Sequence, residues 1–287
     1  MFNGSLVALI TPFRDGSVDK TALRQLVKFH LEQGTHGLVP VGATGESAIL
    51  TMKEHRSVVE VVVHEVGGEI PVIAGAGSNN PVEAIALSQD AEQCGVDATL
   101  HVAGYYNRPS QEGIYQHFAV VHDAIEKPIL AYNLPRRTIV DIQPETMRRI
   151  AELPEVVGVK DATCDLTRPL LEAQTNRPFC LLSGEDALAV AYNVHGGQGC
   201  ISVPANVAPS LCSQMQSACA EGDFASALQI QKRLLPLHQI LFEEPSPAGV
   251  KFACSLLGLT TDTCRLPIVP LDGSTKERIR EVMTELE

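Results

Sequence analysis

Residues 156–163 read Val-Val-Gly-Val-Lys-Asp-Ala-Thr, a short apolar, β-branched run that ends on a lysine. This composition predicts a buried strand. Lys160 is the unusual residue, because an ammonium group loses most of its hydration at the end of such a strand. It is either a structural lysine, paired with Asp161 or Glu185 or extended to solvent, or an amine of lowered pKa that forms a Schiff base with a carbonyl. The rest of the sequence decides between the two interpretations.

Short apolar runs alternate with longer amphipathic stretches on both sides of this strand. The eight predicted strands span residues 6–10, 37–41, 71–74, 98–102, 128–132, 156–160, 179–183 and 199–203. Helical patterns lie between them, at residues 19–33, 51–66, 81–94, 111–125, 144–152, 165–175, 185–194 and 207–220. Eight strand–helix units predict an α/β fold in which a parallel sheet closes into a (β/α)8 TIM barrel. A doubly wound sheet is the alternative, disfavoured because no glycine-rich dinucleotide motif follows the first strand.

Two of the predicted helices begin with specific signals. Thr51 followed by Glu54 is a capping box. Asn80 provides a second cap, with Pro81 at the first helical position and Glu83 in the first turn.

The last part of the chain carries three more helical patterns, at residues 223–242, 246–258 and 273–286. They are too short to predict as an independent domain. We expect residues 1–222 to form the barrel, with an active site at its C-terminal rim, and residues 223–287 to form a C-terminal helical extension packed on it.

Composition narrows the class of protein. A net charge of −12 and a pI near 5.2 over 287 residues argue against a nucleic-acid or membrane surface. The eight cysteines contain no C-x-x-C pair, which favours reduced thiols in a cytoplasmic protein. No signal peptide or transmembrane stretch is predicted. The histidines show no H-E-x-x-H or similar spacing, so we expect no metal site.

The functional groups of such a barrel lie just past the carboxyl ends of its strands. Tyr105, Tyr106 and Tyr132 follow or end the fourth and fifth strands, and Lys160 ends the sixth. The turn at 42–45, Gly-x-x-Gly, offers free amides to a carboxylate. A lysine, a tyrosine that moves protons and a set of amides suit an α-keto acid handled as an imine.

With these residues the sequence closely resembles the dihydrodipicolinate synthase family, within the pyruvate-dependent class I aldolases that include N-acetylneuraminate lyase. The resemblance extends from Phe2 to Pro267. The Gly-x-Thr-Gly-Glu turn at 42–46 and the lysine strand are typical of the superfamily. Tyr-Tyr-Asn-Arg-Pro-Ser-Gln-Glu-Gly at 105–113 and Tyr-Asn-x-Pro-x-Arg-Thr at 132–138 are typical of the synthases.

The resemblance implies a Schiff-base condensation of pyruvate with L-aspartate 4-semialdehyde to 4-hydroxy-tetrahydrodipicolinate, in lysine and diaminopimelate biosynthesis. Lys160 would form the imine, and Tyr132 would donate and accept the protons. Thr44 and Ile201 would hold pyruvate, with Gly184 nearby. No metal and no organic cofactor would take part.

Two further implications concern the second substrate and the assembly. Arg137 would bind the carboxylate of the aldehyde substrate. Tyr106 would reach into the active site of a neighbouring subunit, which implies a tight dimer and, by family habit, a homotetramer built as a dimer of dimers.

One substrate-binding position departs from the family pattern. The family's proton relay resembles tyrosine–threonine–tyrosine, and its threonine falls at Ala43. Alanine has no hydroxyl, so either a water bridges Tyr132 and Tyr106 or the relay is weaker. Arg136 and Ile139 are smaller departures at the same rim.

The resemblance also suggests an effector site for L-lysine at a dimer cleft. A carboxylate and an amide there suit an α-amino acid, although Met52 replaces a histidine of some regulated members. The alternative is that these are only helix-start and surface residues. The matching positions are Ser47, Ala48, His55, Asn79, Glu83 and Tyr105.

Two alternatives to the synthase remain open at this stage. One is a related pyruvate-dependent aldolase or lyase that acts on another aldehyde or sugar acid, which Ala43 and the departures at 136–139 support and the 105–113 stretch opposes. The other is a catalytically silent binding protein, which predicts the loss of chemical residues although Lys160 and Tyr132 are both present.

Overall fold

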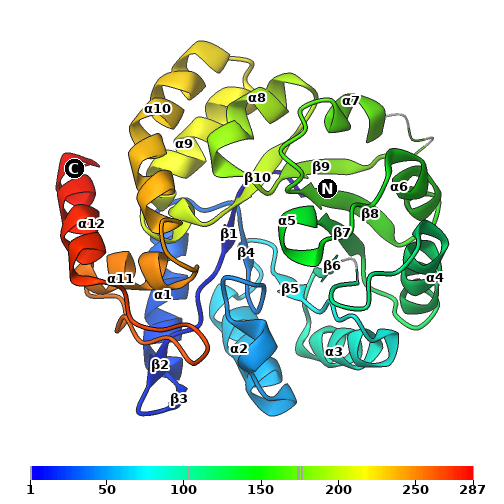
Figure 1. Ribbon diagram of the computed structural model, residues 1–287, viewed down its shortest axis with the longest axis horizontal. Helices are drawn as coiled ribbons and strands as arrows, with labels where there is room; N and C mark the ends of the chain where they lie inside the picture. Colours follow the sequence, from blue (N-terminus) through cyan, green and yellow to red (C-terminus); the bar gives the residue numbers. More distant parts are fainter. Residues whose placement is uncertain (1, 103, 173–174, 176, 287) are drawn as a thin grey trace.

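The computed structural model of the chain describes residues 2–102, 104–172, 175 and 177–286. One parallel eight-stranded sheet forms its centre, in the order β4-β1-β10-β9-β8-β7-β6-β5. The sheet ends meet at a parallel bridge between Leu38 and Val72, so the barrel is nearly closed (Figure 1). The strands are β1 Gly4–Ala8, β4 Gly37–Val39, β5 Ile73–Gly75, β6 Ala98–Val102, β7 Ile129–Asn133, β8 Val156–Asp161, β9 Cys180–Ser183 and β10 Gly199–Ser202. The predicted barrel is confirmed, with strand boundaries shifted by one or two residues.

Helices cover the outside of the strands (Figure 1). Three predicted helices are shorter than expected: α4 ends at His122, α7 begins at Arg168, and α8 follows a 3-10 turn at Asp186–Leu188. Residues 173 and 174, predicted to be helical, lie outside the described residues. The barrel helices are α1 Lys20–Glu32, α2 Met52–Val66, α3 Pro81–Cys94, α4 Gln111–His122, α6 Pro144–Ala151, α7 Arg168–Glu172, α8 Ala189–Val194 and α9 Pro209–Ala220.

Several short elements near the rim were not predicted from the sequence. A hairpin of β2 (Phe13–Arg14) and β3 (Ser17–Val18) follows β1, and the one-turn helix α5 (Pro135–Thr138) follows β7. Two 3-10 turns, Ser47–Ile49 and Pro204–Asn206, complete the set.

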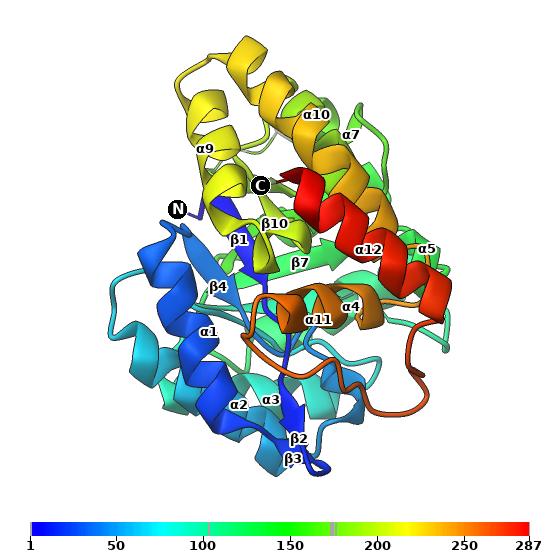
Figure 2. The same ribbon diagram turned by 90° about the vertical axis from the view of Figure 1, so that its left-hand side faces the viewer.

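The C-terminal helices are α10 (Phe224–Leu241), α11 (Ala248–Leu256) and α12 (Gly273–Leu286). They lie together on one flank of the barrel, where α10 packs against α9 and α12 (Figure 2). Leu237 of α10 belongs to the same apolar cluster as Leu6 of β1, so the extension shares the barrel's core. The domain boundary between residues 222 and 223 stays a prediction.

Two expectations drawn from the composition concern the cysteines and membrane-spanning segments. All eight cysteines, each of which the structure describes, are free thiols. In the described part of the chain, none of the helices has the length and apolar character to cross a bilayer.

The two predicted helix caps are confirmed. Thr51 Oγ1 accepts the amide of Glu54 at 3.2 Å, and Glu54 Oε2 accepts the amide of Thr51 at 3.0 Å, which completes the capping box. Asn80 Oδ1 accepts the amide of Val82 at 3.1 Å, with Pro81 at the first helical position.

We expect Thr51→Ala to lower the free energy of unfolding by about 1 kcal/mol, because the first turn of α2 loses its acceptor. Urea denaturation followed by circular dichroism measures the change. Thr21→Ala is the matched control, since Thr21 is exposed in the first turn of α1. Equal losses in the two variants would contradict a specific role of the cap.

Candidate active site

A cavity of about 500 Å³ opens at the carboxyl ends of the strands. Its wall draws on the loops after β4, β5, β6 and β7, on the end of β8 and on residues 246–247 and 267–268 of the C-terminal extension. The predicted site residues in this wall are Ala43, Thr44, Tyr105, Tyr132, Arg137 and Lys160. Residues that are far apart in the sequence therefore meet in one cavity, as the barrel prediction requires.

Lys160 is only 6 % exposed, and its Nζ atom lies 4.4 Å from the centre of the Tyr132 ring. The two side chains are neighbours because Tyr132 of β7 and Lys160 of β8 are register partners. The carboxylates proposed for a structural lysine are occupied elsewhere. Asp161 Oδ1 accepts the amide of Thr163 at 2.8 Å, and Glu185 Oε1 lies 2.7 Å from His238 Nε2.

Among the described residues, the ammonium group of Lys160 forms no ion pair. It is instead a buried amine beside an aromatic ring and a cavity. From this position the amine can reach a carbonyl group bound in the cavity, as a Schiff-base lysine must.

Gly184 and Ile201 lie at the edges of this arrangement. A Cβ atom on Gly184 would lie 3.1 Å from Cε of Lys160, so glycine leaves room for the lysine stem. The Gly184 amide donates to the carbonyl of Asp161 at 2.6 Å and holds the turn against β8. Ile201 is 1 % exposed within β10 and is not part of the cavity wall.

The turn after β4 has unusual backbone geometry. Val41 and Glu46 have φ angles of 50° and 57°, which non-glycine residues rarely adopt. Thr44 is 8 % exposed between them and lines the cavity, as does Ala43. The methyl group of Ala43 provides no proton-transfer group in this wall.

Arg137 reaches the cavity from α5, and a buried polar network holds the loop behind it. Asn133, at the end of β7, donates to Asp141 Oδ1 at 2.8 Å and accepts the amide of Ile142 at 3.1 Å. Arg168 is 4 % exposed and pairs with Asp141. The sequence analysis missed Arg168, because a single arginine in a short helix carries no periodic signal.

Glu172 extends this network deeper into the barrel wall. Arg168 lies 3.2 Å from its carboxylate. Burial nevertheless raises the pKa of Glu172 to about 8, and the charge of Asp161 adds to the effect.

Tyr106, like Gly184, Ile201 and Asn79, is a predicted residue that is not part of the cavity wall. Its side chain is 97 % exposed, and its φ angle is 67°. The loop that carries it is tied to the start of α3, since Asn79 donates to the Tyr105 carbonyl at 3.1 Å and Asn107 donates to the Asn79 carbonyl at 3.0 Å.

The predicted effector positions adjoin the same cavity. Burial lowers the pKa of His55, whose Nε2 lies 2.7 Å from the Gly75 carbonyl oxygen, so its ring is neutral at neutral pH. Glu83 Oε2 accepts from Ser78 at 2.5 Å. Asn79 lies outside the wall and contacts it through Tyr105. The positions in the wall are Ser47, Ala48, His55, Glu83 and Tyr105.

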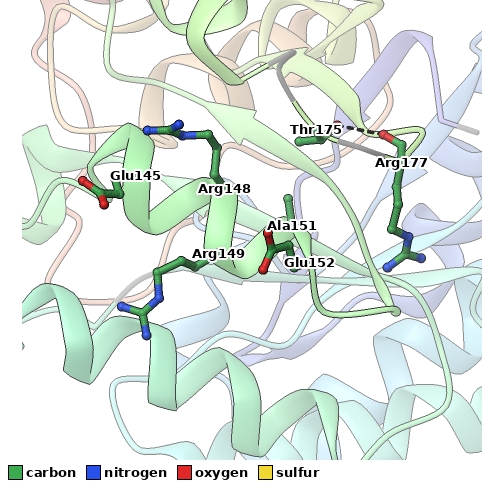
Figure 3. Close-up of a pocket in the computed structure, with 7 residues that line it drawn as sticks. All are labelled: Glu145, Arg148, Arg149, Ala151, Glu152, Thr175 and Arg177. Atoms are coloured by element: carbon green, nitrogen blue, oxygen red, sulfur yellow. Dashed lines mark hydrogen bonds between the residues drawn. The ribbon is translucent and has the colours of Figure 1, made fainter.

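A second cavity, of about 350 Å³, lies beside α6 and contains none of the predicted site residues (Figure 3). Arg149 is paired with Glu112 at 2.9 Å and stacks over Tyr115, and Arg177 donates to the Pro154 carbonyl at 2.7 Å. Elsewhere in the described residues, no three His, Cys, Asp or Glu side chains gather closely enough to hold a metal ion. The predicted absence of a metal stays a prediction.

Comparisons with known proteins agree with the site. The model of the dihydrodipicolinate synthetase family matches residues 1–286. A 4-hydroxy-tetrahydrodipicolinate synthase of Parvibaculum lavamentivorans is 57% identical over 284 residues, which cover 99% of this chain and 98% of that protein. The chloride-inhibited dihydrodipicolinate synthase of Acinetobacter baumannii, complexed with pyruvate, superposes with a TM-score of 0.97 at 40% identity, over 100% of this chain and 99% of that one. The dihydrodipicolinate synthase of Cyanidioschyzon merolae with lysine bound superposes with a TM-score of 0.96 at 34% identity, over 99% of this chain and 98% of that one.

The turn after β9 depends on an ion pair with the C-terminal extension. Burial alone would lower the pKa of His238, but its hydrogen bond to Glu185 and the charge of Asp186 outweigh burial and raise it above 6.5. The hydrogen bond from His238 holds the pKa of Glu185 below 4.5. The stabilisation that protonated His238 provides is complete below the pKa of the unfolded histidine, and it is lost as the pH rises through the higher pKa of the folded state. The stabilisation that ionised Glu185 provides is lost as the pH falls through the lowered pKa of that carboxyl group in the folded state.

We therefore expect His238→Gln to reduce the free energy of unfolding by about 1–2 kcal/mol. The reduction should be largest between pH 4.5 and pH 6.5, the unperturbed pKa values of the two groups. Urea denaturation at several pH values measures it. His64→Gln is the control, because the His64 side chain is 85% exposed. A pH-independent loss would contradict the ion pair.

Proposed function

The chain belongs to the dihydrodipicolinate synthetase family, and we propose that Lys160 carries out its chemistry as a Schiff-base nucleophile. The reaction is the condensation of pyruvate with L-aspartate 4-semialdehyde to 4-hydroxy-tetrahydrodipicolinate, a lyase activity of lysine and diaminopimelate biosynthesis. One observation carries the assignment of Lys160: a buried amine without a carboxylate partner among the described residues, set against Tyr132 in the rim cavity.

The reaction follows from the chemistry of a buried amine. Nζ of Lys160 attacks C2 of pyruvate, and water leaves to give an imine. Loss of a proton from C3 gives an enamine, whose C3 attacks the aldehyde carbon of the second substrate. The amino group of that substrate then attacks the imine carbon, which closes the ring and releases Lys160. One water is lost overall.

Tyr132 is the proposed donor and acceptor of protons, because its ring lies 4.4 Å from the amine and lines the same cavity. Ala43 leaves it without the relay hydroxyl, and we assign that position to a water molecule. Alanine at position 43 does not change the proposed substrates, because relatives at 57%, 54% and 51% identity are named 4-hydroxy-tetrahydrodipicolinate synthase. No observation favours another aldehyde.

The remaining roles are proposed from the family resemblance. Thr44 and Ile201, with Gly184 nearby, would hold the pyruvate portion, and Arg137 in the cavity wall would pair with the carboxylate of the aldehyde substrate. Tyr106, which is 97 % exposed and is not part of its own cavity wall, would complete the site of a second copy in a homotetramer built as a dimer of dimers.

L-Lysine is the proposed effector. The related synthase of Cyanidioschyzon merolae is described with lysine bound, and the matching positions of this chain adjoin one cavity. Glu83 would receive the ammonium groups, and Asn79 and Tyr105 would contact the carboxylate.

Reduction with borohydride in the presence of pyruvate tests the nucleophile. We expect a stable pyruvyl adduct on Lys160, detected by intact mass and peptide mapping, and none in Lys160→Ala. Tyr132→Phe is the matched variant: it should still be trapped, while kcat falls about 10²-fold because proton transfer is impaired. A folded protein that shows no adduct, or an adduct at another lysine, would refute the proposal.

Isothermal titration with L-lysine tests the effector. We expect saturable heat at or below millimolar ligand and binding roughly 10-fold weaker in Glu83→Gln, since a charge-assisted contact is lost. Glu69→Gln, at an exposed glutamate in the loop after α2, should bind as the parent does. Absence of heat at millimolar lysine would exclude the site.

A further inference from the structure

The C-terminal extension inserts a buried cation beside the active-site turn. Lys251 of α11 has a fully buried side chain, and its Nζ pairs with Oε1 of Glu46. The same ammonium donates to the Thr263 carbonyl at 2.8 Å and lies 4.1 Å from the centre of the Phe13 ring. Glu46, whose side chain is 2% exposed, belongs to the turn that carries Thr44.

The second oxygen of Glu46 is also occupied from the extension. Oε2 accepts the backbone amide of Arg265 at 3.0 Å. The guanidinium of Arg265 donates to Glu54 at 2.5 Å and to the Gly16 carbonyl at 2.8 Å. Both ends of the Glu46 carboxylate are therefore fixed by residues more than two hundred positions away in the sequence.

The turn needs such support because its backbone is strained. Val41, a β-branched residue, and Glu46 both have positive φ angles, and each is unfavourable in isolation. Gly75 is required beside it, since a Cβ there would clash with the Val41 carbonyl. Thr11 Oγ1 adds one more restraint by donating to the Gly45 carbonyl at 2.7 Å. Such a conformation persists only where its surroundings determine it.

The ion pair is poorly explained by stability alone. Burial lowers the pKa of Lys251, although the charge of Glu46 acts against burial. Taking two charges out of water costs about as much as their attraction returns, and apolar replacements of buried pairs are often neutral or stabilising. A fixed ion pair does, however, hold the groups around it in a defined position. Here it holds part of the wall of the rim cavity, because Glu46 and Thr44 both line that cavity.

We propose that Lys251 is a positioning residue for the pyruvate site: through Glu46 it holds the strained turn 41–46, so that Thr44 stays in the wall that also holds Lys160. This inference rests on the proposed function, in which Thr44 binds the pyruvate portion. It gives Lys251, which is not part of the cavity wall, a part in substrate binding.

Steady-state kinetics of Lys251→Met, which keeps the length of the side chain and removes its charge, test the proposal. We expect KM for pyruvate to rise about 10-fold or more, because small displacements of a positioning group have large effects. The KM for the aldehyde substrate should change less than twofold, since Arg137 lies on α5. Borohydride should still label Lys160 at saturating pyruvate. Arg278→Met is the control. Arg278 lies on α12 and pairs with Glu243, so this variant removes another ion pair of the extension and should leave both KM values unchanged.

A second variant separates positioning from stability. In Lys251→Met combined with Glu46→Leu no buried charge is left unpaired, so thermal stability should return toward that of the parent while KM for pyruvate stays raised. This variant carries the test if Lys251→Met does not fold. A KM for pyruvate within twofold of the parent in either folded variant overturns the inference. Failure of the parent itself to be trapped by borohydride would instead overturn the proposed function.

Discussion

The carboxyl ends of the parallel strands meet at one rim of the barrel, so side chains at the ends of neighbouring strands are brought together. This constraint shapes the rim cavity. β7 and β8 pair in register, and Tyr132 and Lys160 are carried to the same level of the barrel. Lys160 is buried there, beside the Tyr132 ring and the rim cavity. The nearly closed sheet supplies this environment, because β8 has neighbours on both edges and its last residues are buried.

The extension is part of that environment. α10 contributes His238 to the turn after β9, and α11 contributes Lys251 to the turn after β4. Each of them meets a carboxylate in a loop of the rim. Two loops at the carboxyl ends of the strands are therefore held by contacts with the C-terminal extension. A loop that carries a binding group is more useful when its conformation does not depend on the ligand, because less ordering free energy is then lost on binding.

Much of the barrel and part of the site were predictable from the sequence. The Val-Val-Gly-Val-Lys run, the capping box at Thr51 and the cap at Asn80 are local patterns, and the structure confirms each of them. Other features were not predictable, for physical reasons. The hairpin β2–β3 has strands of two residues, too short for any periodicity. Lys251 and Glu46 are 205 residues apart, and nothing in either neighbourhood indicates the pairing.

Ala43 separates two parts of the chemistry that the family pattern would join. In the proposed mechanism, formation of the imine needs the amine of Lys160, and it does not involve residue 43. The later proton transfers are assigned to Tyr132, beside which Ala43 offers no hydroxyl group. Tyr106, the other tyrosine that the family pattern implies, is 97 % exposed and is not part of the cavity wall. Under this proposal the side chain of residue 43 cannot join the two phenols, so Ala43 affects the proton transfers and leaves the nucleophile unchanged.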